Sequence, residues 1–157
     1  MTRVGLISDT HGLMRPEALA FLAGCDYIVH AGDVGKQDVL AALCAIAPLT
    51  VVRGNNDTDA WASALPETAE LVTEQIRILV IHDVAEVVLS SPLPNVVVSG
   101  HSHKPATSTR DGVLFVNPGS AGPRRFTLPI SVAELRVDGA TATPRIIELD
   151  CASSKRR

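Results

Sequence analysis

Val96-Val97-Val98-Ser99-Gly100-His101-Ser102-His103 combines a short apolar segment with a polar loop, and the rest of the chain repeats this arrangement. Three consecutive β-branched valines are typical of a buried β-strand. A glycine then allows a turn, and His101 and His103 follow two positions apart. In extended backbone, residues two apart project to the same side, so both imidazoles could face one site. Taken alone, a His-x-His pair is a weak indication of metal binding.

The first third of the chain predicts alternating strands and helices. The expected elements are a strand at 4–7, a helix at 16–23, a strand at 27–29, a helix at 37–47 and a strand at 49–52. This order implies a parallel sheet with right-handed crossovers. Each strand runs into a polar, glycine-bearing loop, and open α/β sheets hold ligands at this carboxyl edge. The residues expected along that edge are Asp9, His11, Asp33 and Asn55.

From Glu67 onward the sequence predicts strands in succession. They are expected as a hairpin at 68–73 and 76–81, single strands at 96–99 and 113–116, and a closing hairpin at 130–137 and 141–149. The turns within the two hairpins carry Glu74-Gln75 and Asp138-Gly139, and an Asp111-Gly112 turn precedes the strand at 113–116. The second half is therefore expected to form a mixed or antiparallel sheet. Together the two halves predict an α/β fold, a four-layer α/β/β/α sandwich with two mixed β-sheets packed face to face.

Composition limits the class of protein. A length of 157 residues predicts one domain, expected over 1–151, with 152–157 as a disordered tail. A net charge of −3 gives no reason to expect a nucleic-acid surface. Cys25, Cys44 and Cys151 lack metal-ligand spacing, and we expect buried, reduced thiols at Cys25 and Cys44. The sequence shows neither a signal-like segment nor an apolar run of membrane-spanning length, so we expect a cytoplasmic protein.

Every histidine lies at or just after the end of an expected strand. These five residues are His11, His30, His82, His101 and His103. Beside them lie the carboxylates of Asp9 and Asp33 and the amide of Asn55. Imidazole, carboxylate and amide oxygen ligands suit divalent transition metals. Two such ions about 3.5–4 Å apart can hold a phosphoryl group and activate water.

These residues occur in the order Asp9-x-His11, Gly32-Asp33, Gly54-Asn55-x-Asp57, His82 and Gly100-His101-x-His103. The order resembles the calcineurin-like metallophosphoesterases. The short chain and the loop Asn117-Pro118-Gly119-Ser120 resemble the small bacterial and archaeal phosphodiesterase branch. The resemblance implies an α/β/β/α sandwich with two divalent transition-metal ions, Mn²⁺ foremost, with Fe, Zn²⁺ or Ni²⁺ as alternatives. Matched by position, it implies Asp9, His11 and His103 on one ion, Asn55, His82 and His101 on the other, and Asp33 bridging both.

The resemblance further implies a phosphodiesterase in which metal-bound hydroxide attacks phosphorus in line. Asp33 and Asn55 would act in catalysis as metal ligands. Many family members have a histidine after the metal-binding asparagine, placed to assist the leaving group, where this chain has Asn56. His30 has no ligand position in the family pattern; we interpret it as a supporting residue and as a substitute proton donor. Asp57 is expected to orient a ligand or fix the turn.

Other readings of the same residues stay open. Asp9 and Asp33 could cap the following helices, Asn55 could belong to a plain turn, and His82 could be a solvated strand-end residue, since Asp83 stands where the family usually has glycine. Arg124 and Arg125 could reach a substrate phosphate or face solvent.

Two further functions are alternatives: a non-catalytic scaffold, as is known for a retromer subunit resembling this fold, and a metal-binding module. The expected partner is a small phosphate-ester substrate, without nucleic acid or membrane, and the chain could form a homo-oligomer.

Overall fold

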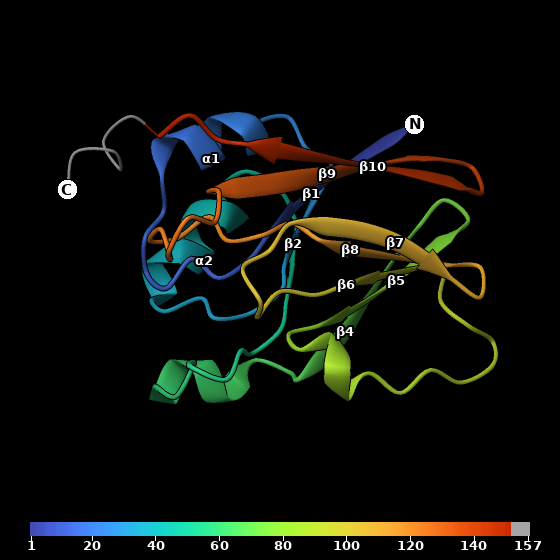
Figure 1. The fold of residues 1–157 in the computed structure, drawn as a ribbon, viewed down its shortest axis with the longest axis horizontal. Helices are drawn as coiled ribbons and strands as arrows, with labels where there is room; N and C mark the ends of the chain where they lie inside the picture. The colour runs from blue at the N-terminus through green and yellow to red at the C-terminus, as the bar shows by residue number, and fades with distance from the viewer. Residues whose placement is uncertain (152–157) are drawn as a thin grey trace.

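Two five-stranded sheets packed face to face form the body of the protein, in a computed structural model that describes residues 1–151 (Figure 1). The first sheet has the order β10-β9-β1-β2-β3 and the second the order β4-β5-β6-β8-β7. In the first sheet the strands are β1 (Thr2–Ile7), β2 (Tyr27–His30), β3 (Leu49–Val51), β9 (Ser131–Asp138) and β10 (Thr141–Glu148). In the second they are β4 (Thr68–Thr73), β5 (Ile76–Ile81), β6 (Val96–Val98), β7 (Ala106–Arg110) and β8 (Val113–Asn117).

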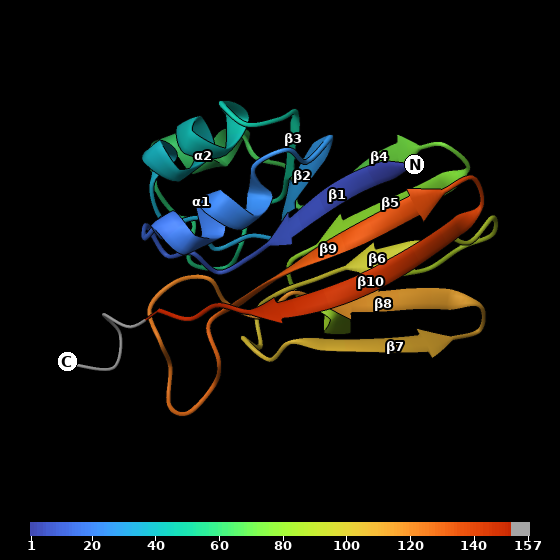
Figure 2. The same cartoon turned by 90° about the horizontal axis from the view of Figure 1, so that it is seen from above.

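Helices α1 (Pro16–Leu22) and α2 (Gln37–Cys44) cover the outer face of the first sheet (Figure 2). Pro16 lies in the first turn of α1, where a missing N–H costs nothing. Neighbouring residues of β1 divide between the two faces, with Leu6 in the core between the sheets and Ile7 under the helices. Strands β1, β2 and β3 run parallel, as the strand–helix alternation predicts. Helix α2 ends earlier than expected, at Cys44, whose side chain is exposed rather than buried.

The closing hairpin of β9 and β10 joins the first sheet, which corrects the expectation that the second half of the chain forms one sheet. Strand β9 pairs antiparallel with β1, and Leu135 and Val137 point into the core between the sheets. This pairing turns β1 from an exposed edge into a central strand. Both sheets are therefore mixed, as the expected sandwich requires.

In the second sheet, β5, β6 and β8 run parallel and β4 and β7 are antiparallel edge strands. The sequence did not predict β7, because all five of its residues are exposed and it lacks an apolar face. The outer layer over this sheet is thin. It consists of the short 3₁₀ helix η2 (Val84–Glu86) and the segment after it, from which Val87 and Leu89 pack against the sheet. A second 3₁₀ helix, η1 (Ala60–Ala64), follows β3.

The parallel strands of both sheets end at the same edge of the sandwich. The loops after β1, β2 and β3 lie there, together with those after β5 and β6, so the polar residues of separate segments converge. No helix within residues 1–151 has the length and apolar character needed to cross a membrane. The expected tail at 152–157 lies outside the described residues.

Candidate metal centre

Asp9, His11 and His103 form the first group of donor atoms. Asp9 and His11 follow β1, whereas His103 follows β6. Asp9 Oδ1 lies 3.5 Å from His103 Nε2 and 3.9 Å from His11 Nε2. One donor atom from each residue lies within 4.8 Å of the others, which is the spacing of ligands around one ion.

A second group lies beside the first. His82, directly after β5, places Nε2 3.3 Å from Asp33 Oδ2 and 2.9 Å from Asn55 Oδ1. Asp9, Asp33 and His82 also offer donor atoms within 4.8 Å of one another. His101 completes the set, with Nδ1 3.2 Å from Asn55 Oδ1. The structure thus brings together all seven residues that the sequence singled out as metal ligands.

Asp33 lies between the two groups. Its Oδ2 is 3.6 Å from His11 Nε2 in the first group and 3.3 Å from His82 Nε2 in the second. The backbone N–H of Asn56 donates to Asp33 Oδ1 at 2.8 Å, and its side-chain amide donates to Oδ2 at 3.1 Å. These bonds fix the direction of the carboxylate. Asn56 is therefore a partner of Asp33 in this structure.

The loops reach these positions through unusual backbone. Five of the seven residues adopt left-handed φ values: Asp9 (55°), His11 (47°), Asp33 (57°), His101 (71°) and His103 (66°). Non-glycine residues seldom occupy this region, and strained backbone of this kind gathers at functional sites. The remaining two, Asn55 and His82, do not share this conformation.

Ser8, which the sequence reading missed, fixes one oxygen of Asp9. Asp9 Oδ2 accepts the Ser8 hydroxyl at 2.7 Å and the backbone N–H of His101 at 3.0 Å. Gly100 makes this possible, because a Cβ there would collide with the Ser8 hydroxyl and with Asp9 Oδ2. The only signal in the sequence was a polar residue next to Asp9 at the end of a buried strand.

Asp57 ties two of the loops together, in agreement with its expected supporting role. Its Oδ2 accepts the backbone N–H groups of Val34 and Gly54, at 3.1 and 2.9 Å, and its Oδ1 accepts that of Gly35 at 3.0 Å. The loop after β2 is thereby held against the loop after β3. Asp33 and Asn55 keep their relative positions as a result.

Unpartnered buried atoms show that the residues fit a metal ion. Among the described residues, Asp9 Oδ1 and His11 Nε2 are buried without a hydrogen-bond partner, although both atoms can form hydrogen bonds. A buried polar atom without a partner costs about 1–3 kcal/mol. A cation between Asp9 Oδ1 and the imidazoles would satisfy these atoms, and nitrogen and oxygen donors in this combination suit transition ions.

Among the candidate ligands, two histidines have shifted pKa values, and the two shifts have opposite directions. Burial, aided by the charge of Arg125, lowers the pKa of His103 to about 4, which keeps its ring neutral and able to bind metal. Burial also opposes the charged form of His82, but hydrogen bonds to Asp33 and Ala31 and the charge of Asp9 outweigh it and raise its pKa. His82 Nδ1 donates to Ala31 O at 2.8 Å, which leaves Nε2 to face the other ligands.

The carboxylates also differ. Burial raises the pKa of Asp9 above its ordinary value. Burial acts in the same direction on Asp33, but hydrogen bonds from His82 and the Asn56 backbone overcome it and bring the pKa of Asp33 to about 2. Asp33 is therefore ionised over the whole range in which the protein would work.

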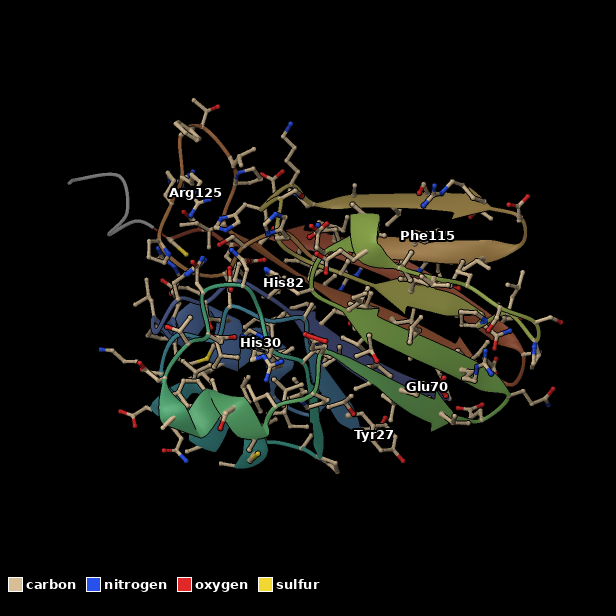
Figure 3. All side chains as sticks on the ribbon, turned by 90° about the horizontal axis from the view of Figure 1, so that it is seen from below. Tyr27, His30, Glu70, His82, Phe115 and Arg125 are labelled. Atoms are coloured by element: carbon tan, nitrogen blue, oxygen red, sulfur yellow. The ribbon has the colours of Figure 1, made fainter. Side chains whose placement is uncertain are left out.

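His30 lies at the end of β2 (Figure 3). It is fully buried, and the Gly32 N–H donates to its Nδ1 at 3.0 Å. Its Nε2–H is then left to donate to the Thr10 hydroxyl, 3.0 Å away. Burial lowers the pKa of His30 to about 4. These contacts favour support of the loops after β1 and β2 over the role of proton donor considered from the sequence.

A cleft of about 520 Å³ opens beside the second group. Its lining includes the candidate ligands His82, His101 and Asn55, together with four charged residues, namely Arg53, Glu67, Asp83 and Glu86. Arg125 lies on the loop before β9 (Figure 3). Asn117, the last residue of β8, donates to Gly100 O at 2.9 Å, so the start of this loop borders the site. Arg124 and Arg125 are both exposed.

The sequence and structure match known proteins over most of the chain. The sequence profile of the calcineurin-like phosphoesterase superfamily domain matches residues 2–140. A probable metallophosphoesterase of Methanothermobacter thermautotrophicus is 35% identical over 159 residues, covering 92% of this chain and 91% of that protein.

Two solved structures share the fold. Vps29 of Chaetomium thermophilum superposes with a TM-score of 0.76 at 19% identity, covering 94% of this chain and 95% of its own. A novel archaeal phosphodiesterase superposes with a TM-score of 0.76 at 21% identity, covering 93% of this chain and all of its own. At these identities the structures confirm the expected sandwich. The sequence matches settle the family: the chain belongs to the calcineurin-like phosphoesterase superfamily, whose members use divalent metal ions.

Proposed function

We propose that the protein is a dinuclear metal-dependent phosphodiesterase. Asp9, His11 and His103 would hold one ion, and Asn55, His82 and His101 the other. The observation that carries this proposal is the position of Asp33, whose Oδ2 lies within 3.6 Å of a histidine nitrogen in each group. Mn²⁺ is the ion we expect first, with Fe, Zn²⁺ or Ni²⁺ as alternatives, because imidazole ligands favour transition ions over Mg²⁺.

Divalent ions in such a pair supply Lewis-acid stabilisation of charge on the phosphoryl oxygens and lower the pKa of a bound water. The chain's part is to hold the ligands in place. Asn56 orients Asp33 through two hydrogen bonds, and Ser8 orients Asp9 through one. Neither Asn56, an amide, nor the buried His30 is placed to protonate a leaving group. We therefore propose that the enzyme depends on leaving groups that depart unaided.

A diester substrate is supported by the shape of the site. The thin layer formed by η2 and the following segment leaves the cleft beside His82 and His101 open. An open cleft accepts the second substituent of a diester on either side of the phosphorus. The archaeal phosphodiesterase of the same fold makes this class of reaction a reasonable first choice.

Removal of the metal tests the proposal. Purified protein is treated with a chelator, and hydrolysis of bis(p-nitrophenyl) phosphate is measured before and after Mn²⁺ or Mg²⁺ is added back. We expect chelation to abolish activity and Mn²⁺ to restore it more fully than Mg²⁺. Elemental analysis is expected to give about two ions per chain.

The same experiment separates the enzyme from its alternatives. A scaffold would bind metal weakly or not at all and would hydrolyse none of a panel of phosphodiesters. A metal-binding module would hold ions tightly without turnover. Full activity in the chelated sample would refute the dinuclear proposal.

A further inference from the structure

Asp83 occupies the wall of the cleft next to the second group of donor atoms. It follows His82 directly, and its Oδ2 lies 3.8 Å from His101 Nε2, the ring nitrogen that faces away from Asn55. Its side chain is 32% exposed and that of His101 46%, so this contact lies at the mouth of the site. Asp83 thus adds a third carboxylate beside those of Asp9 and Asp33.

The position of Asp83 is fixed by local structure. Its Oδ1 accepts the Ala85 N–H at 3.0 Å, and this bond caps the first turn of η2. With one oxygen used by the cap, the other is directed toward His101. The charge therefore stays at the edge of the site.

Nearby basic groups do not neutralise Asp83. Arg53, the basic residue lining the cleft, pairs with Glu67 at 3.4 Å and donates to Leu65 O at 3.3 Å. His101 Nε2 lies 3.8 Å from Asp83 Oδ2, beyond hydrogen-bond distance. Glu86 lines the same cleft and adds to the negative charge there.

We infer that Asp83 is a specificity-determining residue that favours monoanionic phosphodiesters over dianionic phosphomonoesters. The inference rests on the proposed phosphoesterase function and names its substrate class. A fixed carboxylate in the wall of the cleft where the substrate would bind repels a dianion more than a monoanion, by an amount set by one additional charge. At the rim of a solvated cleft this difference amounts to about tenfold in relative rate or binding.

The test compares two substrates that share a leaving group. Methyl p-nitrophenyl phosphate carries one negative charge, and p-nitrophenyl phosphate carries two when the pH is well above its second pKa of about 6. Taking the ratio of their kcat/KM values removes effects common to both reactions. In Asp83→Asn, which keeps the size and the capping oxygen, we expect the diester-to-monoester ratio to fall about tenfold.

Two further variants distinguish local charge from structure. Asp83→Glu restores the charge and should restore the ratio. Asp111→Asn makes the same chemical change at the β7–β8 turn, at the opposite end of the sheet from the ligand loops, and should leave the ratio unchanged. The effect of Asp83→Asn should shrink as salt is added, because salt screens charges at an exposed rim.

Binding provides a readout that does not require turnover. Calorimetry of the Mn²⁺-loaded protein should show that Asp83→Asn tightens binding of inorganic phosphate several-fold more than binding of dimethyl phosphate. Equal changes for the two ligands, together with an unaltered rate ratio, would overturn the inference. A wild-type protein that binds Mn²⁺ and phosphate but hydrolyses neither ester would refute the proposed function, while the binding preference would still decide the role of Asp83.

Discussion

The two halves of the candidate metal centre, one for each group of donor atoms, differ in how complete they are without metal. In the first group, Asp9 and His103 are almost fully buried and their donor atoms face one another across a gap too wide for hydrogen bonds. In the second group, His82 and His101 both contact Asn55 Oδ1 at hydrogen-bond distance, and the His101 side chain is 46% exposed. The donor atoms of the first half are spaced as they would be around an ion, whereas those of the second half contact one another through Asn55.

This difference indicates an order of binding. An ion entering the first group meets atoms that lack partners, so little must be displaced. An ion entering the second group must replace the contacts of Asn55 with His82 and His101. We therefore expect the first site to bind more tightly, and the second ion to set the metal concentration at which activity appears.

The largest effect is expected at Asp33, the residue that the two halves share. Asp33→Ala should lower kcat/KM for an aryl diester by at least about 10³-fold, because both ions lose a ligand. Metal stoichiometry by elemental analysis should fall as well. Two tightly retained ions in this variant would show that the halves are independent and that Asp33 does not bridge them.

The second prediction distinguishes metal binding at the first half from metal binding at the second. His103→Ala should weaken the tightest Mn²⁺ binding by about 10²-fold, whereas His82→Ala should leave that step intact and weaken the second one. Calorimetric titration of both variants resolves the two steps. If both variants lose the same step, the donor atoms form one site.

Acidification should affect the two halves at different pH values. A proton on a ligand nitrogen competes with metal, so affinity falls once the pH drops below the pKa of that nitrogen. The pKa of His82 is raised above its ordinary value of 6.5, whereas that of His103 is lowered to about 4. Mn²⁺ titrations should therefore show the second step weakening first as the pH is lowered from neutrality. Simultaneous loss of both steps would contradict the comparison.

The smallest expected effect concerns the leaving group. Without a proton donor, the rate should depend steeply on leaving-group pKa, with aryl diesters hydrolysed much faster than alkyl diesters. Asn56→His should raise the rate for poor leaving groups about tenfold, a fraction of what an evolved general acid contributes. Asn56→Ala serves as the control, because it loses the hydrogen bond to Asp33 without supplying an acid. Equal behaviour of the two variants would exclude an acid role at this position.

Much of this architecture could be predicted because its signals are local. Apolar runs such as Val96–Val98 indicate buried strands. Every proposed metal ligand lies in a polar loop directly after such a strand, so the sequence was sufficient to identify them as candidates. Strand β7 was missed since its polar residues carry no hydrophobic periodicity. The placement of β9 beside β1 was missed for a different reason: strand pairing between distant segments leaves no local pattern.

The same distinction between local and long-range contacts applies within the site. A supporting role for Asp57 was expected, and its bond from the Gly54 N–H lies within the same turn. Its bonds from Val34 and Gly35 join a separate loop, which the sequence does not reveal. The contact of Asp83 with His101 joins the ends of two different strands, and sequence spacing contains no information about it. Likewise, the burial of His30 depends on packing of β2 between its neighbours, which the sequence shows only as one more strand-end histidine.

The left-handed backbone at five proposed ligand positions has a consequence for how such a chain can change over time. Each aspartate or histidine held there costs about 1 kcal/mol relative to a residue suited to that conformation. The sum is a sizeable part of a net folding stability of about 5–15 kcal/mol. A descendant released from metal chemistry would become more stable by replacing these residues with asparagine or glycine. Accumulated substitutions at Asp9, His11, Asp33, His101 and His103 would therefore record the loss of activity in a lineage before any change of fold.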